Sequence, residues 1–76
     1  MNGTLADLDQ LQHLEQTYAD SSVDILICPP ATLVHAASSA TKTISIGAQN
    51  CHTQTKGAHT GEISAQQIAD IGARYV

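Results

Sequence analysis

Apolar residues recur at steps of three and four over residues 4–19, where leucines and one tyrosine would share a single stripe of a helix. Thr4 precedes the first leucine and is a plausible N-cap, with Asp7 three positions further on. The pattern therefore predicts an amphipathic helix that packs through one face. The stripe consists of Leu5, Leu8, Leu11, Leu14 and Tyr18.

Two later segments, 23–28 and 43–48, are short and almost continuously apolar. Such runs are typical of strands that are covered on both faces, as in parallel sheets. Residues 30–40 favour a helix between them. Residues 64–72 favour another, because Ser64 and Gln67 have the spacing of a capping box and Gly72 suits a helix end. Residues 74–76 resemble the opening of a further strand. Strands that alternate with helices predict an α/β fold with a parallel sheet.

Composition limits what this segment could do alone. Leu, Ile and Val together make up 16 of 76 residues, and Phe and Trp are absent. A domain of this size buries only about 60% of its unfolded surface, so we expect residues 1–76 to be an incomplete portion of one domain, without an internal boundary. The net charge is −4 with three cationic side chains, which argues against nucleic acid. No apolar run approaches about 18 residues, so no membrane span is predicted, and a cytoplasmic protein is the simplest interpretation.

Four motifs carry a resemblance to a known family. Gly47-Ala48-Gln49-Asn50-Cys51-His52 closes a predicted strand, and Gly57-Ala58-His59-Thr60-Gly61-Glu62-Ile63-Ser64 leads into a helix. The chain opens with Met1-Asn2-Gly3, and Cys28-Pro29-Pro30 ends the earlier strand. In this order they resemble the triosephosphate isomerase family. The resemblance implies that the segment is part of a (β/α)8 TIM barrel with parallel strands, from the first helix to the start of the fourth strand.

The resemblance also implies a dimer contact through the loop from Gln49 to Glu62. In this family the loop reaches across to the partner subunit, with the threonine at its tip and the glutamate facing a partner arginine. His59 replaces the aromatic residue expected before Thr-Gly-Glu, and we hypothesise that it makes dimer packing slightly pH-sensitive. The residues that we expect at this interface are Asn2, Gly3, Gln49, Asn50, His59, Thr60, Gly61 and Glu62.

The activity that the resemblance implies is the interconversion of dihydroxyacetone phosphate and glyceraldehyde 3-phosphate through an enediolate, without a cofactor. The family's asparagine and lysine would precede Met1, and its histidine would follow Val76. No catalytic residue is therefore predicted here, and we expect the segment to supply scaffold and dimer loop and to be inactive alone.

Two alternatives from other functional classes stay open. One is a non-catalytic interaction module whose Thr-Gly-Glu arm binds a partner subunit. The other is a small redox or metal-binding domain built on Cys28 and Cys51. The second lacks Cys-x-x-Cys, and the adjacent pair Cys51-His52 does not have the usual spacing of zinc ligands, so no metal site is predicted. Buried thiols at strand ends are the simpler interpretation.

The remaining ionisable side chains give no catalytic pattern. His13 and His35 fall on predicted helices and are expected at the surface. The glycines of 56–61 match neither dinucleotide-binding nor P-loop spacing. The carboxylates of the first helix are expected to form a solvated acidic face: Asp7, Asp9, Glu15 and Asp20.

Overall fold

Helices and strands alternate along the chain as the sequence predicts, although the strands are much shorter. A computed structural model describes all residues from Met1 to Val76. No helix in it combines the length and the apolar character that crossing a membrane requires. The elements are η1 (Leu5–Asp7), α1 (Leu8–Thr17), β1 (Leu26–Ile27), η2 (Ala31–Leu33), α2 (Val34–Ala40), β2 (Ser45–Ile46) and α3 (Ala65–Asp70).

The sheet is parallel, which confirms the predicted strand direction. β1 and β2 pair with Leu26 opposite Ser45 and Ile27 opposite Ile46. The end of the chain adds a third segment beside β2, where Gly47 and Tyr75 form a parallel bridge. The backbone N–H of Arg74 donates to the Ile46 carbonyl over 3.0 Å. The strand start predicted at 74–76 therefore runs alongside β2.

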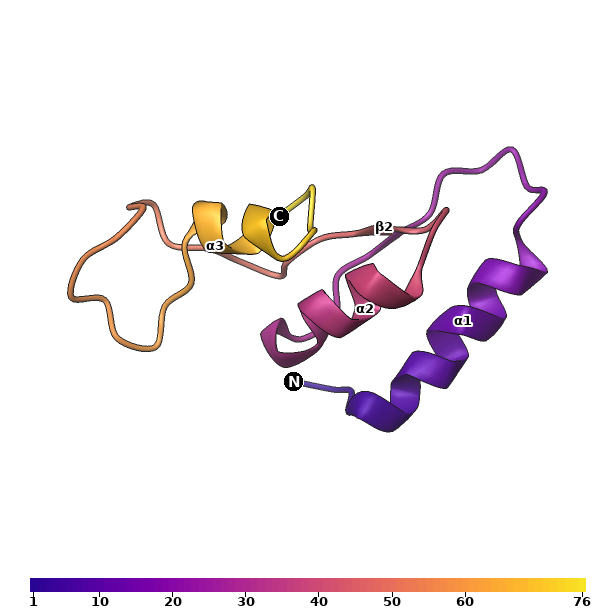
Figure 1. The fold of residues 1–76 in the computed structure, drawn as a ribbon, viewed down its shortest axis with the longest axis horizontal. Coiled ribbons are helices and arrows are strands. Elements are labelled where there is room, and N and C mark those ends of the chain that lie inside the picture. Colours follow the sequence, from indigo (N-terminus) through magenta and orange to yellow (C-terminus); the bar gives the residue numbers. More distant parts are fainter.

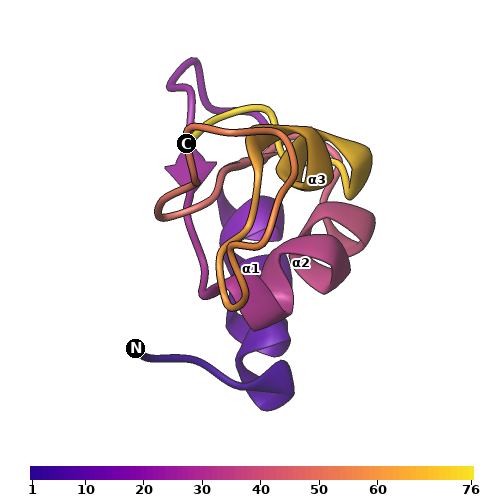
Figure 2. The ribbon, with the colours of Figure 1, turned by 90° about the vertical axis from the view of Figure 1, so that its left-hand side faces the viewer.

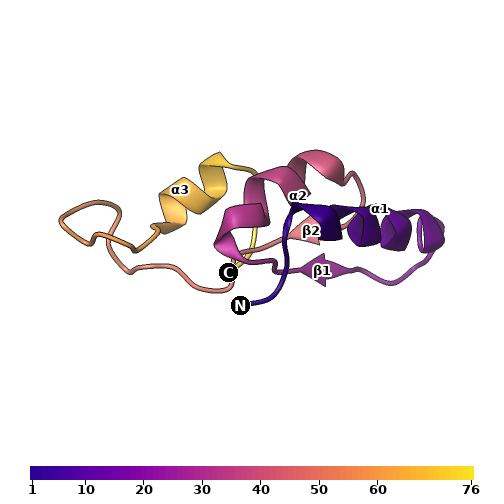
Figure 3. The same cartoon turned by 90° about the horizontal axis from the view of Figure 1, so that it is seen from below.

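All three helices lie on the same side of the strands (Figures 2 and 3). On β2 and its extension, alternate side chains point to the helices, and Ile44, Ile46 and Ala48 are buried. The opposite face has no such cover, so Leu26 is 46% exposed and Tyr75 52% exposed. The helices of residues 1–76 therefore cover one face of the sheet (Figures 2 and 3), whereas continuous apolar runs are typical of strands covered on both faces. The complete buried cluster comprises Leu11, Val34, Ala37, Ile44, Ile46, Ala48, Ile68 and Ala73.

The cysteines show the same asymmetry of the sheet. Cys28 is exposed, and Cys51 is half-buried against the core cluster. The prediction of buried thiols is wrong for Cys28, because this residue follows β1 on the face that lacks helices. Both thiols are free.

The first helix packs through the middle of its predicted stripe. Leu11 is buried, and Leu8 and Leu14 pack against the core. Leu5 and Tyr18 remain 68% and 51% exposed, so the stripe is shorter than predicted. The reason is helical geometry: Leu5 belongs to the 3₁₀ turn η1, whose period differs from that of an α-helix, and Tyr18 follows the last residue of α1.

Glu15 is not part of a solvated acidic face, contrary to the prediction. Its Oε1 accepts the backbone N–H groups of Lys42, Thr43 and Ile44 over 2.6, 2.7 and 3.1 Å, and the Thr43 hydroxyl over 3.1 Å. These bonds lower the pKa of Glu15 from 4.5 to about 2; the Thr43 N–H has the largest effect, and burial acts in the opposite direction. One carboxylate thus fastens α1 to the turn that leads into β2.

The last helix begins and ends as its sequence predicts. The Ser64 hydroxyl accepts the Gln67 N–H over 3.2 Å, while the Gln67 side chain accepts the Ser64 N–H over 3.0 Å. Gly72 follows the helix with φ of +98°, a conformation that residues with a side chain rarely adopt. A Cβ at Gly72 would also collide with Ser38 of α2. The glycine thus lets α3 approach α2 closely.

Candidate functional site

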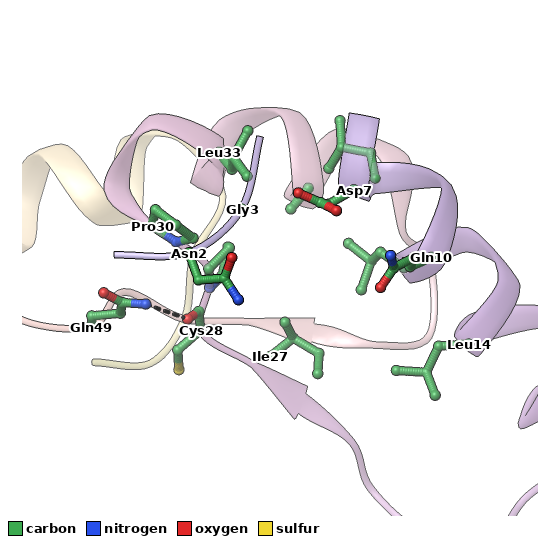
Figure 4. Close-up of a pocket in the computed structure, with 14 residues that line it drawn as sticks. Asn2, Gly3, Asp7, Gln10, Leu14, Ile27, Cys28, Pro30, Leu33 and Gln49 are labelled. Carbon is green, nitrogen blue, oxygen red and sulfur yellow. Dashed lines mark hydrogen bonds between the residues drawn. The ribbon is translucent and has the colours of Figure 1, made fainter. Parts of the chain in front are cut away.

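The carboxyl ends of both strands meet at one edge of the sheet, which places the following loops side by side. Figure 4 shows the contact that joins them: the Gln49 side-chain Nε2 donates to the Cys28 carbonyl over 3.0 Å. In parallel α/β folds this edge is where binding sites gather. Gln49 therefore connects the end of β1 to the start of the long loop.

A hollow of about 410 Å³ opens beside this contact, between α1 and the end of β1. The chain start lines it, and Gly3 adopts φ of +122° beside Pro30 and Leu33, which a Cβ at this position would contact (Figure 4). Half of the lining residues are hydrophobic. The lining is Asn2, Gly3, Asp7, Leu8, Gln10, Leu11, Leu14, Ile27, Cys28, Pro29, Pro30, Leu33, Ala37 and Gln49.

Asp7 and Cys28 are the ionisable residues that line this hollow, although the Cys28 sulfur points away from α1 (Figure 4). Asp7 already accepts the backbone N–H of Thr4 over 2.7 Å and so caps the first helical turn. The remaining polar groups are the amides of Asn2, Gln10 and Gln49. Amides can bind a polar surface but cannot transfer protons at neutral pH, so the hollow is suited to binding and lacks an acid–base pair.

Residues 49–63 form a long irregular loop that projects from the body at one end of the molecule (Figure 1). Its two ends are held together by the His52 N–H, which donates to the Ile63 carbonyl over 2.8 Å. Near its tip, the Glu62 N–H donates to the His59 carbonyl over 2.9 Å. Thr60 and Gly61 lie in this turn and are exposed. Gly61 has φ of +92°, so the turn there uses a glycine conformation.

Inside the loop, two histidines stack on each other. The rings of His52 and His59 lie 4.0 Å apart between centroids, with 26° between their planes. Gln54 contacts both: its N–H donates to His52 Nδ1 over 3.0 Å, and its Oε1 lies 3.2 Å from His59 Nε2. The two histidines and Gln54 line a hollow of about 190 Å³ that has no hydrophobic residue in its lining; the other lining residues are Thr55, Lys56, Gly57, Glu62, Ser64 and Gln67. The sequence interpretation missed this pair, and its only signal was two histidines seven residues apart in one loop.

The structure gathers some of the predicted interface residues and separates others. Asn2, Gly3 and Gln49 share the large hollow. Asn50 lines a separate small apolar hollow with α2 and α3 residues. His59 and Glu62 line the polar hollow inside the loop, and Thr60 and Gly61 form the exposed turn between them. Apart from Asn50, the predicted residues therefore fall on two surfaces, one at the chain start and one on the projecting loop.

The structure shows no group of side chains suited to bind a metal ion. No three side chains among His, Cys, Asp and Glu lie close enough to hold an ion. The two stacked imidazoles also do not converge, because the lone pairs of nearly parallel rings point sideways in their own planes. The predicted surface positions of His13 and His35 are confirmed, since both are exposed on helices.

Parallel strands alternating with helices on one face, and a long loop at the carboxyl edge, define a segment of a (β/α)8 TIM barrel. The sequence profile described as triosephosphate isomerase matches residues 1–76, and the chain belongs to the triosephosphate isomerase family. It is 50% identical over 76 residues to the triosephosphate isomerase of Ruegeria sp. strain TM1040, covering all of this chain and 31% of that protein. The triosephosphate isomerase of Rhizobium meliloti strain 1021 is 48% identical over 81 residues, and the match covers all of this chain and 32% of that protein. The chain thus spans about a third of the length of these relatives.

Proposed function

We propose that this chain is a segment of a homodimeric, cofactor-independent enzyme that interconverts dihydroxyacetone phosphate and glyceraldehyde 3-phosphate in the cytoplasm. The observation that carries the proposal is the family match over all 76 residues, together with curated relatives that are named triosephosphate isomerase. Within that enzyme the segment contributes barrel wall, the hollow at Asn2 and Gly3, and the projecting loop.

The shape of the chain supports a role for the loop in binding a second copy. The turn at Thr60 and Gly61 belongs to a loop that points away from the chain start, so the two predicted surfaces lie apart within one molecule (Figures 1 and 3). A second subunit would bring the turn of one chain to the amide-lined hollow of the other. In this arrangement Thr60 is the inserted side chain and Glu62 pairs with an arginine of the partner subunit.

The chemistry is assigned to groups outside this segment. The large hollow contains no acid–base pair, and the loop carries its two histidines in contact with Gln54 and with each other. The segment's part in catalysis is to hold the barrel and the interface in shape. By itself it is inactive.

An activity assay tests the catalytic part of this proposal. The full-length protein that contains these residues is expected to interconvert the two triose phosphates without added metal or cofactor. The purified 76-residue chain is expected to show no turnover above the buffer rate. A full-length protein without isomerase activity would refute the enzyme assignment, and an active purified segment would refute the assignment of catalysis to the rest of the chain.

A charge placed on the turn tests the dimer. Thr60→Arg in the full-length protein is expected to convert dimer to monomer in sedimentation experiments, because it would bury a cation in a hollow of which half the lining is hydrophobic. Thr17→Arg, at the exposed end of α1, is the matched control and should leave the dimer intact. Equal dimer content in both variants would show that the turn at Thr60 does not form the interface.

The non-catalytic interaction module remains the second candidate, because the hollow at the strand ends has amides but no proton-transfer pair. The same two experiments separate the candidates. A full-length protein that dimerises through Thr60 but lacks turnover would favour the interaction module, whereas turnover together with dimerisation favours the enzyme.

A further inference from the structure

The shape of the projecting loop depends on polar contacts around two histidines. His52 and His59 stack with 4.0 Å between ring centroids, and Gln54 lies against both. Both imidazoles belong to the same loop, so their contact closes it upon itself. His52 is half-buried and His59 is exposed, so both rings can exchange protons with water.

The contacts of the two rings respond differently to protonation. The Gln54 N–H donates to His52 Nδ1 over 3.0 Å, and a nitrogen can accept this bond only while it carries no proton. His59 Nε2 faces an amide oxygen, Gln54 Oε1, over 3.2 Å and therefore donates to it. That bond survives when His59 takes up a proton. His52 must be neutral for the observed loop, whereas His59 need not be.

Stacking adds a second constraint. A charged imidazole can lie over a neutral ring, since a cation is attracted to an aromatic face. Two charged imidazoles at this separation repel each other. The other charged groups that line the same hollow are Lys56 and Glu62, one of each sign. The packed start of α3 contributes only Ser64 and Gln67, which do not titrate near neutral pH. Lys56 and Glu62 together carry no net charge, so the lining has no excess negative charge to offset a second positive charge on the histidine pair.

We propose that His52 and His59 form a proton-sensitive latch that holds residues 49–63 closed while His52 is neutral and releases them when His52 is protonated, with a proton on His59 adding repulsion between the rings. The closed loop requires the neutral form of His52, so acid that protonates this ring removes the Gln54 hydrogen bond and destabilises the closed loop. The consequence for association rests on the proposed dimer: release of the loop in mild acid weakens the contact between subunits.

Nuclear magnetic resonance on the full-length protein tests the latch whether or not the protein is a dimer. Close contacts between ring protons of His52 and ring protons of His59 are expected at about pH 7.5 and are expected to disappear near pH 5.5. The Gln54 amide resonance should shift over the same pH range as the ring resonances of His52. His13 and His35 serve as internal controls, because they lie on helices and their titration should leave the loop signals unchanged. Ring contacts and a Gln54 amide signal that persist unchanged at low pH would overturn the proposal.

A substitution separates the latch from a general acid effect. In His52→Asn the side-chain oxygen can still accept the Gln54 N–H but cannot take up a proton in this range. We expect the wild-type dimer to dissociate about tenfold more readily near pH 5.5 than near pH 7.5, and the variant to lose most of that dependence. His35→Asn is the matched control and should keep the wild-type behaviour.

The magnetic resonance and dissociation experiments separate a failure of the latch from a failure of the proposed dimer. A dimer whose pH dependence is the same in His52→Asn as in the wild type would overturn the latch. A protein that is monomeric at both pH values would refute the proposed dimer, and the ring contacts and Gln54 amide would then decide the latch alone.

Discussion

The helical body and the projecting loop of this chain are stabilised by different forces. Eleven of the 76 residues are buried, and none of them lies in residues 49–63. In the body, apolar side chains from α1, α2, α3 and β2 meet in one cluster. Apart from Cys51 and Ile63, which pack against this cluster, the loop is held by hydrogen bonds and one ring stack.

This difference determines how each region responds to change. Buried apolar area stabilises by an amount that scales with area and depends little on pH. Exposed polar contacts exchange for contacts with water at little net cost, typically about 1 kcal/mol each. The body is therefore suited to hold a scaffold, and the loop is suited to adjust its shape on binding.

The largest expected effect comes from the core. Ile46→Ala removes a side chain that is 4% exposed and should lower the free energy of unfolding by about 2–5 kcal/mol, because it leaves a cavity between the sheet and the helices. Thr55→Ala in the exposed loop should change it by less than about 0.5 kcal/mol. Urea unfolding of the two full-length variants measures both, and similar losses would mean that body and loop are not stabilised differently.

Two glycines with similar backbone conformations offer a closer comparison. Gly72 and Gly61 have φ of +98° and +92°, so alanine strains either position. A Cβ at Gly72 would collide with Ser38, whereas nothing lies within 4 Å of a Cβ at Gly61. We expect Gly72→Ala to cost about 2–4 kcal/mol and Gly61→Ala about 1 kcal/mol. Thermal unfolding would contradict this explanation if the two losses were equal.

The junction between the two regions should show an intermediate effect. Ser64 is buried where the loop enters α3, and its hydroxyl caps the helix. Ser64→Ala should cost about 1 kcal/mol, and Ser64→Asp should retain most of the stability because aspartate is also a good N-cap. Equal losses in chemical denaturation of the two variants would indicate that packing at Ser64, and not capping, is what matters.

The smallest effect concerns pH and the body. The pKa of Glu15 is lowered to about 2, chiefly by the Thr43 N–H, so its ionised form stabilises the fold above about pH 4.5. That contribution is lost as the pH falls from about 4.5 to about 2. Glu15→Gln should reduce the free energy of unfolding at neutral pH by about 1 kcal/mol after allowance for solvent screening. It should also weaken the dependence of that free energy on pH below about pH 4.5. If Glu15→Gln loses stability between pH 5 and pH 2 as the wild type does, Glu15 is not the source of the acid sensitivity.

Local signals in the sequence predicted the elements well. The capping box at Ser64 and Gln67 and the helix end at Gly72 are confirmed, because each depends on residues within one helical turn. Parallel pairing is confirmed too. The predicted strand lengths were wrong, since they depend on backbone pairing between segments that are far apart in sequence. The predicted burial of Cys28 was wrong because it depends on which face of the sheet the helices cover.

The candidate site was only partly predictable. Gln49 was predicted to lie at the strand end, and its bond to the Cys28 carbonyl joins residues that are far apart in sequence. Asn2 and Gly3 do lie in the same hollow as Gln49. Their role in binding a partner stays a prediction. The stacking of His52 and His59 could not be read from spacing, because loop residues have no fixed period that would place one ring over another.

The sequence by itself determined the order of helices and strands, the helix caps and the family, because these follow from short motifs and local periodicity. Tertiary structure alone decided which apolar residues are buried, which carboxylate is held, and which histidines touch. Glu15 shows the reason: its partners are the backbone groups of residues 42–44, and only the packing of α1 beside that turn brings them within reach. Contacts between distant segments depend on the packing of the whole chain, which no short stretch of sequence encodes.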